Sequence, residues 1–243
     1  MVTEVKYDLP KLKTPPIVNP ELAKILLYGQ SGIGKSTWAS KIKDGIFLAT
    51  EPGLGQLDAM QQPIKSWEDM LGYCREISRG EHGFKTIIID TLDQMHRYAE
   101  QFIAKKYKVD HVGDLDFGLG YAHVKDEMIR VLLKLGSLPY GLVLIAHCSD
   151  EEITTRTGKY TRVVPSGLPK KVRCFVEAYT DVILYAECIQ STDGSTNEIT
   201  DKRVVHTQTS PFYIAKDRSN RLPETMDLDY QVFARAFTAK TKE

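Results

Sequence analysis

Short apolar runs recur along the chain between more polar stretches. The run at 87–89 is three consecutive isoleucines, which leaves no polar face. Strands that are apolar on both faces are typical of the centre of a parallel sheet, where helices cover both sides. We therefore predict an α/β fold whose strands lie at residues 25–28, 45–50, 84–91, 141–146 and 181–185.

The stretches between these runs carry apolar residues at helical spacing. We predict helices at residues 35–42, 54–82, 91–107, 124–135 and 230–237. The buried face of the second helix should be formed by Trp67, Met70, Leu71 and Ile77. Residues 108–123 hold three glycines and several acids and should form a mobile loop. A polar turn is expected at 190–200, and paired strands at 203–207 and 211–215.

The first run leads directly into a glycine-rich phosphate-binding pattern, G-x-x-x-x-G-K-[ST]. Its residues, with one further threonine, are Gly29, Gln30, Ser31, Gly32, Ile33, Gly34, Lys35, Ser36 and Thr37. Glycines permit backbone conformations closed to other residues, so successive N–H groups can face one anion at a helix start. We expect Lys35 to bridge the outer phosphates and Ser36 to ligate Mg²⁺. The alternative is an ordinary glycine turn between strand and helix.

Two acids stand at the ends of predicted strands: Glu51 directly follows the run at 45–50, and Asp90 closes the run at 84–91. Ligands in an open parallel sheet bind beyond the carboxyl ends of the strands, so Glu51 and Asp90 should both lie near the phosphates. Asp90 fits the acid that holds the Mg²⁺ shell beside Ser36. Glu51 could orient or deprotonate the water that attacks the γ-phosphate, or it could be a solvated turn residue.

One histidine also ends a strand. His147 follows the run at 141–146, where it could hydrogen-bond the γ-phosphate and report hydrolysis to the segment behind it. The alternative is a histidine that satisfies a loop carbonyl.

The segment behind His147 is the one conspicuous charge asymmetry in the sequence. Residues 153–175 contain no acid, and their glycines and prolines predict an irregular, flexible loop. Basic side chains with an aromatic suit a single-stranded nucleic-acid backbone with stacked bases. The candidate DNA-binding residues are Arg156, Lys159, Tyr160, Arg162, Lys170, Lys171 and Arg173. A solvated surface loop is the alternative.

Lys216 and Arg218 form a second pair of candidate cations. On an extended strand, residues two apart point to the same side. They could complete the nucleotide site of a neighbouring subunit, or they could be an ordinary solvated edge.

Composition narrows the classes of function. The chain has 243 residues, and 32 Lys plus Arg balance 32 Asp plus Glu. This balance gives no support to a generally basic nucleic-acid coat, so any contact with DNA must come from a local basic segment. The four cysteines show no metal spacing, which favours reduced thiols in the cytoplasm. We expect no signal peptide and no membrane span, and we expect residues 1–21, which are rich in proline, to form an extended arm before a single domain at 22–243.

Taken together, the order of these parts resembles the RecA-type core of recombinases and hexameric helicases over about residues 22–224. GQSGIGKST looks like the Walker A loop, FLATEPG looks like the strand that carries the catalytic glutamate at Glu51, and TIIIDT looks like Walker B at Asp90. His147 occupies the place of a polar γ-phosphate sensor. The basic segment occupies the place of the second DNA-binding loop, and GDLDFGLG that of the first. AKDR looks like a lysine-x-arginine finger that reaches a neighbouring subunit's nucleotide.

The match to short, core-only RecA-like ATPases of bacteriophages, implicated in single-strand annealing and recombination, sets further expectations. It implies a three-layer α/β/α fold with strand order 5-1-4-3-2 and added antiparallel edge strands. It also implies ATP and Mg²⁺ as ligands, a homo-oligomeric ring or filament, single-stranded DNA as partner, and the cytoplasm of a bacterial host. A nucleotide-dependent switch or partner-loading ATPase without DNA contact is the second interpretation. A small-molecule kinase is disfavoured because no acceptor-binding signature is present.

Overall fold

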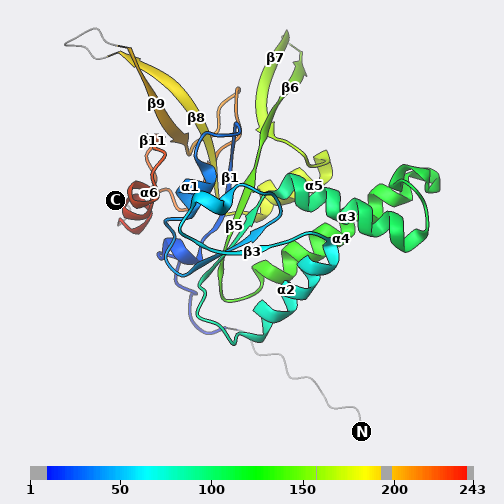
Figure 1. The fold of residues 1–243 in the computed structure, drawn as a ribbon. Coiled ribbons are helices and arrows are strands. Elements are labelled where there is room, and N and C mark those ends of the chain that lie inside the picture. Colours follow the sequence, from blue (N-terminus) through cyan, green and yellow to red (C-terminus); the bar gives the residue numbers. More distant parts are fainter. Residues whose placement is uncertain (1–9, 157, 193–198, 240–243) are drawn as a thin grey trace.

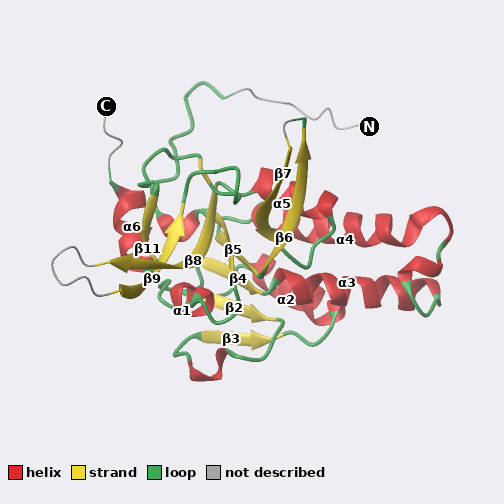
Figure 2. Ribbon diagram, turned by 90° about the horizontal axis from the view of Figure 1, so that it is seen from above, coloured by secondary structure: helices red, strands yellow, loops and turns green. Residues whose placement is uncertain are grey.

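A single large sheet lies between two layers of helices (Figures 1 and 2). The computed structural model describes residues 10–156, 158–192 and 199–239. Its helices are α1 (Lys35–Ala39), α2 (Trp67–Arg79), α3 (Leu92–Tyr107), α4 (Leu119–Gly136), α5 (Lys170–Tyr179) and α6 (Tyr230–Thr238). Its strands are β1 (Lys24–Gly29), β2 (Gly45–Ala49), β3 (Met60–Pro63), β4 (Thr86–Asp90), β5 (Gly141–Ala146), β6 (Cys148–Thr155), β7 (Gly158–Pro165), β8 (Val182–Thr192), β9 (Ile199–His206), β10 (Lys216–Asp217) and β11 (Thr225–Asp227).

The main sheet has nine strands, and its parallel centre has the expected order. The path is β11-β9-β8-β1-β5-β4-β2-β3, with β10 paired to β8 off this path. The five predicted strands are β1, β2, β4, β5 and β8. When they are numbered 1 to 5 in chain order, the path β8-β1-β5-β4-β2 becomes 5-1-4-3-2, which confirms the predicted order. β9, β10 and β11 are the added antiparallel strands. β3, which extends the other edge in parallel with β2, was not predicted.

Alternate residues of the central strands enter two separate cores, which makes the fold three-layered. In β1, Leu26 packs with α2, α3, α4 and α5, whereas Ile25 and Leu27 pack with α1 and α6. Strands buried on both faces need apolar residues at every position. The continuous apolar runs of the sequence thus have their physical cause here, and the α/β/α class is confirmed.

The region 54–82 is only partly helical. It begins with the 3₁₀ turn η2 (Leu54–Gln56) and continues through β3, whose residues are largely exposed and polar. α2 starts where the Ser66 side chain accepts the Asp69 N–H at 3.1 Å, and it ends at Gly80 in the left-handed region. Of the predicted buried face, Trp67, Met70 and Ile77 are buried, and Leu71 is half-buried against the same core.

The prediction of an irregular basic loop at 153–175 is wrong. β6 and β7 form a separate antiparallel pair that projects from the body beyond the end of β5 (Figure 1). We call residues 148–165 the β6–β7 hairpin. Gly158 adopts φ 145°, so the glycine shapes the turn of a hairpin instead of breaking regular structure. Lys170 and Lys171 then open α5.

Other boundaries also differ from expectation. The loop at 108–118 holds the 3₁₀ turns η3 (Val112–Asp114) and η4 (Asp116–Gly118), and α4 starts five residues earlier than predicted. β9 pairs with β8 and not with 211–215, which forms no strand apart from an isolated bridge at Tyr213. The predicted turn at 190–200 falls mostly at 193–198, outside the described residues. Of the predicted arm at 1–21, residues 10–19 form neither helix nor strand, and residues 20 and 21 lie in the 3₁₀ turn η1 (Pro20–Leu22). Residues 1–9 lie outside the described residues.

Phe233 offers a direct test of the core beneath α1. It is fully buried on α6 and packs edge-on against Trp38 of α1, with ring centroids 5.3 Å apart. Phe233→Ala should lower the free energy of unfolding by about 3–5 kcal/mol, because it leaves a cavity between the two helices. Chemical denaturation measures this effect. Gln231→Ala on the exposed side of α6 is the matched control, and equal losses in both variants would contradict this packing.

Candidate functional site

The glycine-rich loop joins β1 to α1 in the conformation that its pattern predicts. Gly32 and Gly34 have φ of 76° and 114°, which disfavours other residues there. A Cβ at Gly29 would lie 2.3 Å from the Ala186 carbonyl oxygen on β8. α1 is shorter than expected and ends at Ala39. The loop therefore depends on its glycines, at 32 and 34 for backbone conformation and at 29 for close packing.

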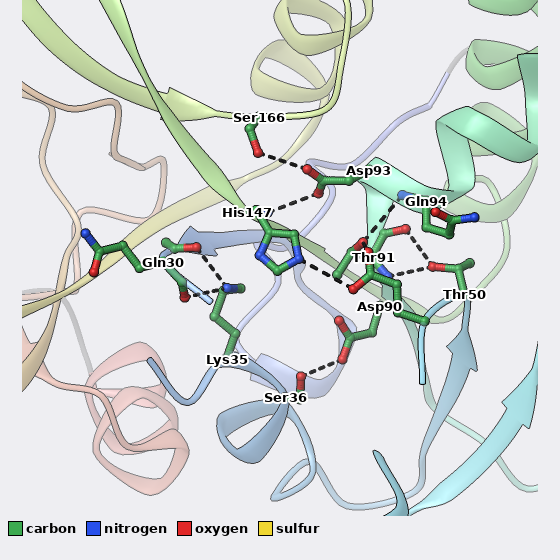
Figure 3. A network of polar contacts seen from close by, with 12 residues as sticks. Gln30, Lys35, Ser36, Thr50, Asp90, Thr91, Asp93, Gln94, His147 and Ser166 are labelled. Carbon is green, nitrogen blue, oxygen red and sulfur yellow. Dashed lines mark hydrogen bonds and ion pairs between the residues drawn. The ribbon is translucent and has the colours of Figure 1, made fainter. Parts of the chain in front are cut away.

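Lys35 is buried, and its ammonium faces the inside of the loop. Its Nζ donates to the carbonyl oxygens of Gly29 at 2.8 Å and Gln30 at 2.9 Å (Figure 3). Burial lowers the pKa of Lys35, and the nearby Asp90 carboxylate opposes this shift. Among the described residues, the hydrogen-bond partners of this buried ammonium are therefore two neutral carbonyls.

Ser36 and Asp90 are in direct contact, as the sequence predicts for a shared metal site. The Ser36 hydroxyl donates to Asp90 Oδ2 at 2.6 Å (Figure 3). Burial raises the pKa of Asp90, while this hydrogen bond lowers it. Hydroxyl and carboxylate oxygens at this separation are ligands that Mg²⁺ accepts.

Glu51 and His147 also converge on this edge of the sheet. Glu51 Oε1 accepts the Thr91 hydroxyl at 2.8 Å, and His147 Nε2 lies 3.5 Å from Glu51 Oε2. The His147 side chain is about one-third exposed, so it can meet a ligand. The sequence predicted both positions but not their contact with each other.

These side chains line one cavity of about 360 Å³. Its lining combines the glycine-rich loop, the acids and the histidine with the turn after β2: Ser31, Gly32, Gly34, Lys35, Ser36, Thr37, Glu51, Pro52, Gly53, Leu54, Gln56, Leu57, Asp90, Thr91 and His147. The cavity lies beyond the carboxyl ends of β1, β2, β4 and β5, where parallel sheets bind ligands.

A hydrogen-bonded pair of threonines, which sequence reasoning missed, fixes the two acids. Thr50 Oγ1 donates to the Thr91 carbonyl oxygen at 2.8 Å and accepts the Thr91 N–H at 2.7 Å. The Tyr98 hydroxyl donates to the Thr50 carbonyl oxygen at 3.2 Å. These bonds tie the end of β2 to the end of β4, beside Glu51 and Asp90. The only signal in the sequence was a threonine next to each acid.

Asp93 is a second residue that sequence reasoning missed. Its Oδ2 accepts the backbone N–H of His147 at 3.0 Å, and its Oδ1 accepts the Ser166 hydroxyl at 2.9 Å (Figure 3). Asp93 lies in the first turn of α3, three positions after Asp90, so its place next to the site follows from the predicted strand end.

The candidate DNA-binding residues do not form one exposed set. Arg156, Lys170 and Lys171 are exposed, and no partner is recorded for their side chains among the described residues. Lys159 is exposed but pairs with Glu152 at 2.8 Å. Tyr160 lies half-buried on β7.

Arg162 and Arg173 make contacts within the chain. Arg162 Nε donates to the Pro211 carbonyl oxygen at 2.9 Å. Arg173 is mostly buried and pairs with Glu151 at 2.5 Å and with Glu177 at 3.4 Å. The placement of Arg173 in a free basic loop was therefore wrong, because acids outside the segment neutralise it.

Lys216 and Arg218 lie away from the cavity, at the start of β8, where β10 pairs with it. Lys216 Nζ donates to the Glu177 carbonyl oxygen, and Arg218 Nη2 donates to the Ala178 carbonyl oxygen at 2.6 Å. Cations at the last carbonyls of a helix are favourable, so both residues cap α5. Neither lines the cavity of its own chain.

The raised pKa of Asp90 predicts a pH-dependent cost of ligand-free folding. Between the unfolded and folded pKa values the folded state binds more protons, so stability falls as pH rises through that window. Asp90→Asn removes this loss. We expect it to melt at a higher temperature than the wild type at about pH 7.5, with the gap narrowing toward about pH 4, the ordinary carboxyl value. A gap that is constant with pH, or reversed, in thermal melts would contradict this.

Within the described residues, no cluster of three or more His, Cys, Asp or Glu side chains could hold a metal ion by itself. In the same part of the chain, no helix has both the length and the hydropathy needed to cross a membrane.

Two known proteins are similar to this chain. The SPbeta prophage-derived uncharacterized protein YorG of Bacillus subtilis (strain 168) is 26% identical over 167 residues, which cover 66% of this chain and 49% of the relative. The chain thus matches about half the length of that protein. The flagellar accessory protein FlaH from Methanocaldococcus jannaschii aligns with a TM-score of 0.44 and 10% identity over 77% of this chain and 78% of that chain.

A family model described as an AAA domain matches residues 21–219. This match covers most of the chain, from the glycine-rich loop through β5 to Lys216 and Arg218. The chain therefore belongs to the AAA domain family, and its fold is that of a P-loop NTPase.

Proposed function

We propose that this protein hydrolyses ATP with Mg²⁺ and couples hydrolysis to single-stranded DNA, as a RecA-like annealing or recombination ATPase of a bacteriophage. The observation that supports hydrolysis is the convergence of Lys35, the Ser36–Asp90 pair and the Glu51–His147 pair in one cavity. A binding-only switch would need the first two features but not a carboxylate aimed into the same cavity.

The donor set fits the two ligands. Lys35 and the loop N–H groups would bind the phosphates, which would replace the carbonyl partners that the ammonium now contacts. Ser36 and Asp90 would hold Mg²⁺, which when bound neutralises charge on the phosphate oxygens. Glu51, oriented by Thr91, would accept a proton from the attacking water. His147 would hydrogen-bond the terminal phosphate.

A smaller hollow adjoins the cavity and would receive the nucleoside. It has a volume of about 120 Å³ and shares Gly34 and Thr37 with the phosphate cavity. Leu228 and Arg203 lie over the glycine loop, 3.5 Å and 3.7 Å from where a Cβ at Gly34 would be. An apolar side chain beside a guanidinium suits a flat heterocycle.

The β6–β7 hairpin and the start of α5 supply the proposed DNA surface. Arg156 on the hairpin and Lys170 and Lys171 on α5 are exposed cations whose side chains have no partner within the described part of the chain. Tyr160 on β7 lies edge-on to Phe212, whose side chain is exposed, with centroids 6.4 Å apart. Aromatic and basic side chains together suit a single strand. A switch or partner-loading ATPase without DNA contact remains the second candidate, favoured by the net charge of zero.

Two substitutions in the cavity separate nucleotide binding from chemistry. Lys35→Ala should abolish ATP turnover because it removes charge compensation at the phosphates. Glu51→Gln should keep ATP affinity and lose turnover by about 10²- to 10⁴-fold, the usual contribution of a general base. Calorimetry and phosphate release measure the two quantities, with Lys43→Ala and Glu224→Gln as exposed controls. Normal turnover in folded Lys35→Ala would refute the site.

The next prediction concerns the DNA surface. Substituting Arg156, Lys170 and Lys171 with alanine should weaken binding of a labelled oligothymidine in fluorescence anisotropy. The salt slope should flatten by about 0.7 for each lost phosphate contact. The control substitutes Arg97, Lys106 and Lys108, three exposed cations on or beside α3. Equal binding by both triple variants would favour the switch interpretation.

A further prediction is that neighbouring subunits complete each site. Lys216 and Arg218 would approach the γ-phosphate of an adjacent protomer, where an arginine supplied in trans is worth about 10³- to 10⁵-fold in rate. Arg218→Ala should bind ATP and hydrolyse it poorly. Mixing it with Lys35→Ala should partly restore turnover, because one protomer offers an intact loop and its neighbour an intact finger. A dead mixture of co-assembled variants would exclude this arrangement.

A further inference from the structure

Both ends of the β6–β7 hairpin meet at one point beside the nucleotide cavity. The chain enters the hairpin directly after His147 and leaves it at Ser166. The Ser166 N–H donates to the His147 carbonyl oxygen at 2.9 Å, which closes the root of the hairpin. A displacement of His147 therefore cannot move one strand of the hairpin without the other.

Asp93 fastens this root to α3. One carboxylate oxygen accepts the His147 N–H and the other accepts the Ser166 hydroxyl, so a single side chain holds both ends (Figure 3). The next residue, Gly167, has φ 69°, and a Cβ there would lie 2.3 Å from Asp93 Oδ1. The absence of a side chain at Gly167 therefore makes room for the Asp93 carboxylate.

Asp93 is also linked to the acids of the cavity. It follows Asp90 and Thr91 in the first turn of α3, where a carboxylate is favoured by the helix dipole. Thr91 in turn donates to Glu51. Two routes therefore connect the cavity to the hairpin root. A displacement of Asp90 would be transmitted through the start of α3, and a displacement of His147 would be transmitted through the end of β5.

The rest of the hairpin is packed so that motion at the root would be passed on. Glu151 on β6 pairs with Arg173 on α5, and the Val163 N–H on β7 donates to the Phe212 carbonyl oxygen at 2.7 Å. The hairpin, α5 and the segment at 211–214 are therefore joined into one unit above the root. This unit carries the exposed cations Arg156, Lys170 and Lys171.

We propose that Asp93 is a positioning residue that couples nucleotide occupancy at His147 to the β6–β7 hairpin, and so to whatever ligand the hairpin binds. The proposal rests on the proposed function for nucleotide binding, but not on DNA as the hairpin ligand. Asp93 does not line the cavity. Its effect acts through the backbone of His147 and the hydroxyl of Ser166.

Hydrogen exchange tests this coupling without any hairpin ligand. Amides at 148–155 and 158–164 are followed with and without saturating Mg²⁺ and a non-hydrolysable ATP analogue. A ligand held by His147 should slow their exchange in the wild type, by a factor within the usual allosteric range of about 5 to 150. Calorimetry on the same samples establishes that the cavity is filled.

The variants separate positioning from mere stability. Asp93→Ala and Ser166→Ala should bind the analogue but reduce the exchange difference toward a factor of one. Asp93→Asn should retain it, because the amide oxygen can accept the His147 N–H while the amide nitrogen donates to Ser166. Ser166→Thr keeps the hydroxyl and should also retain it, which keeps the test valid if Asp93→Ala does not fold. Asp69→Asn is the matched control, since Asp69 accepts a loop N–H from Lys65 at the start of α2.

Each outcome decides between distinct claims. If the wild type does not bind the analogue, the proposed function fails and this inference fails with it. If the wild type binds it and hairpin exchange is unchanged, only the coupling is overturned. If the change persists undiminished in Ser166→Ala and Asp93→Ala, the coupling exists but Asp93 does not carry it.

Discussion

The parallel pairing of β1, β5, β4 and β2 is the constraint on which the rest of the structure depends. Parallel register brings the carboxyl ends of these strands to the same edge of the sheet. Every group of the candidate site follows one of these ends: the glycine loop after β1, Glu51 after β2, Asp90 closing β4 and His147 after β5. This parallel pairing is stable because both faces of the sheet are apolar and covered by helices. The position of the site is therefore a consequence of how the core packs.

Burial also destabilises the charged forms of two groups in the site. Desolvation lowers the pKa of Lys35 and raises that of Asp90, so each charged form is disfavoured where it lies. Neutral carbonyls and one hydroxyl are the hydrogen-bond partners of these two groups. A phosphate and a divalent cation would compensate both charges at once. Functional sites commonly lower the stability of the ligand-free protein in this way. Binding of a ligand that compensates the buried charges restores that stability.

Sequence reasoning succeeded where one physical rule dominated. The fully apolar strands, the glycine loop and the acid at the end of β4 follow from burial and backbone geometry alone. It failed at β3, an exposed edge strand whose Gln61 and Gln62 carry no apolar signal. It also failed at residues 153–165, where Gly158 and Pro165 were interpreted as breakers of regular structure although they are the first and last residues of β7. Contacts between distant residues, such as Arg173 with Glu151 or Asp93 with Ser166, leave no local pattern to find.

A crystal structure with Mg²⁺ and a non-hydrolysable ATP analogue tests the central claim most directly, namely that this cavity binds the triphosphate. The account predicts that Lys35 Nζ leaves the carbonyl oxygens of Gly29 and Gln30 for phosphate oxygens. It also predicts that the Ser36 hydroxyl moves from Asp90 to the metal. An analogue bound elsewhere, with the Lys35 and Ser36 contacts unchanged, would contradict the account.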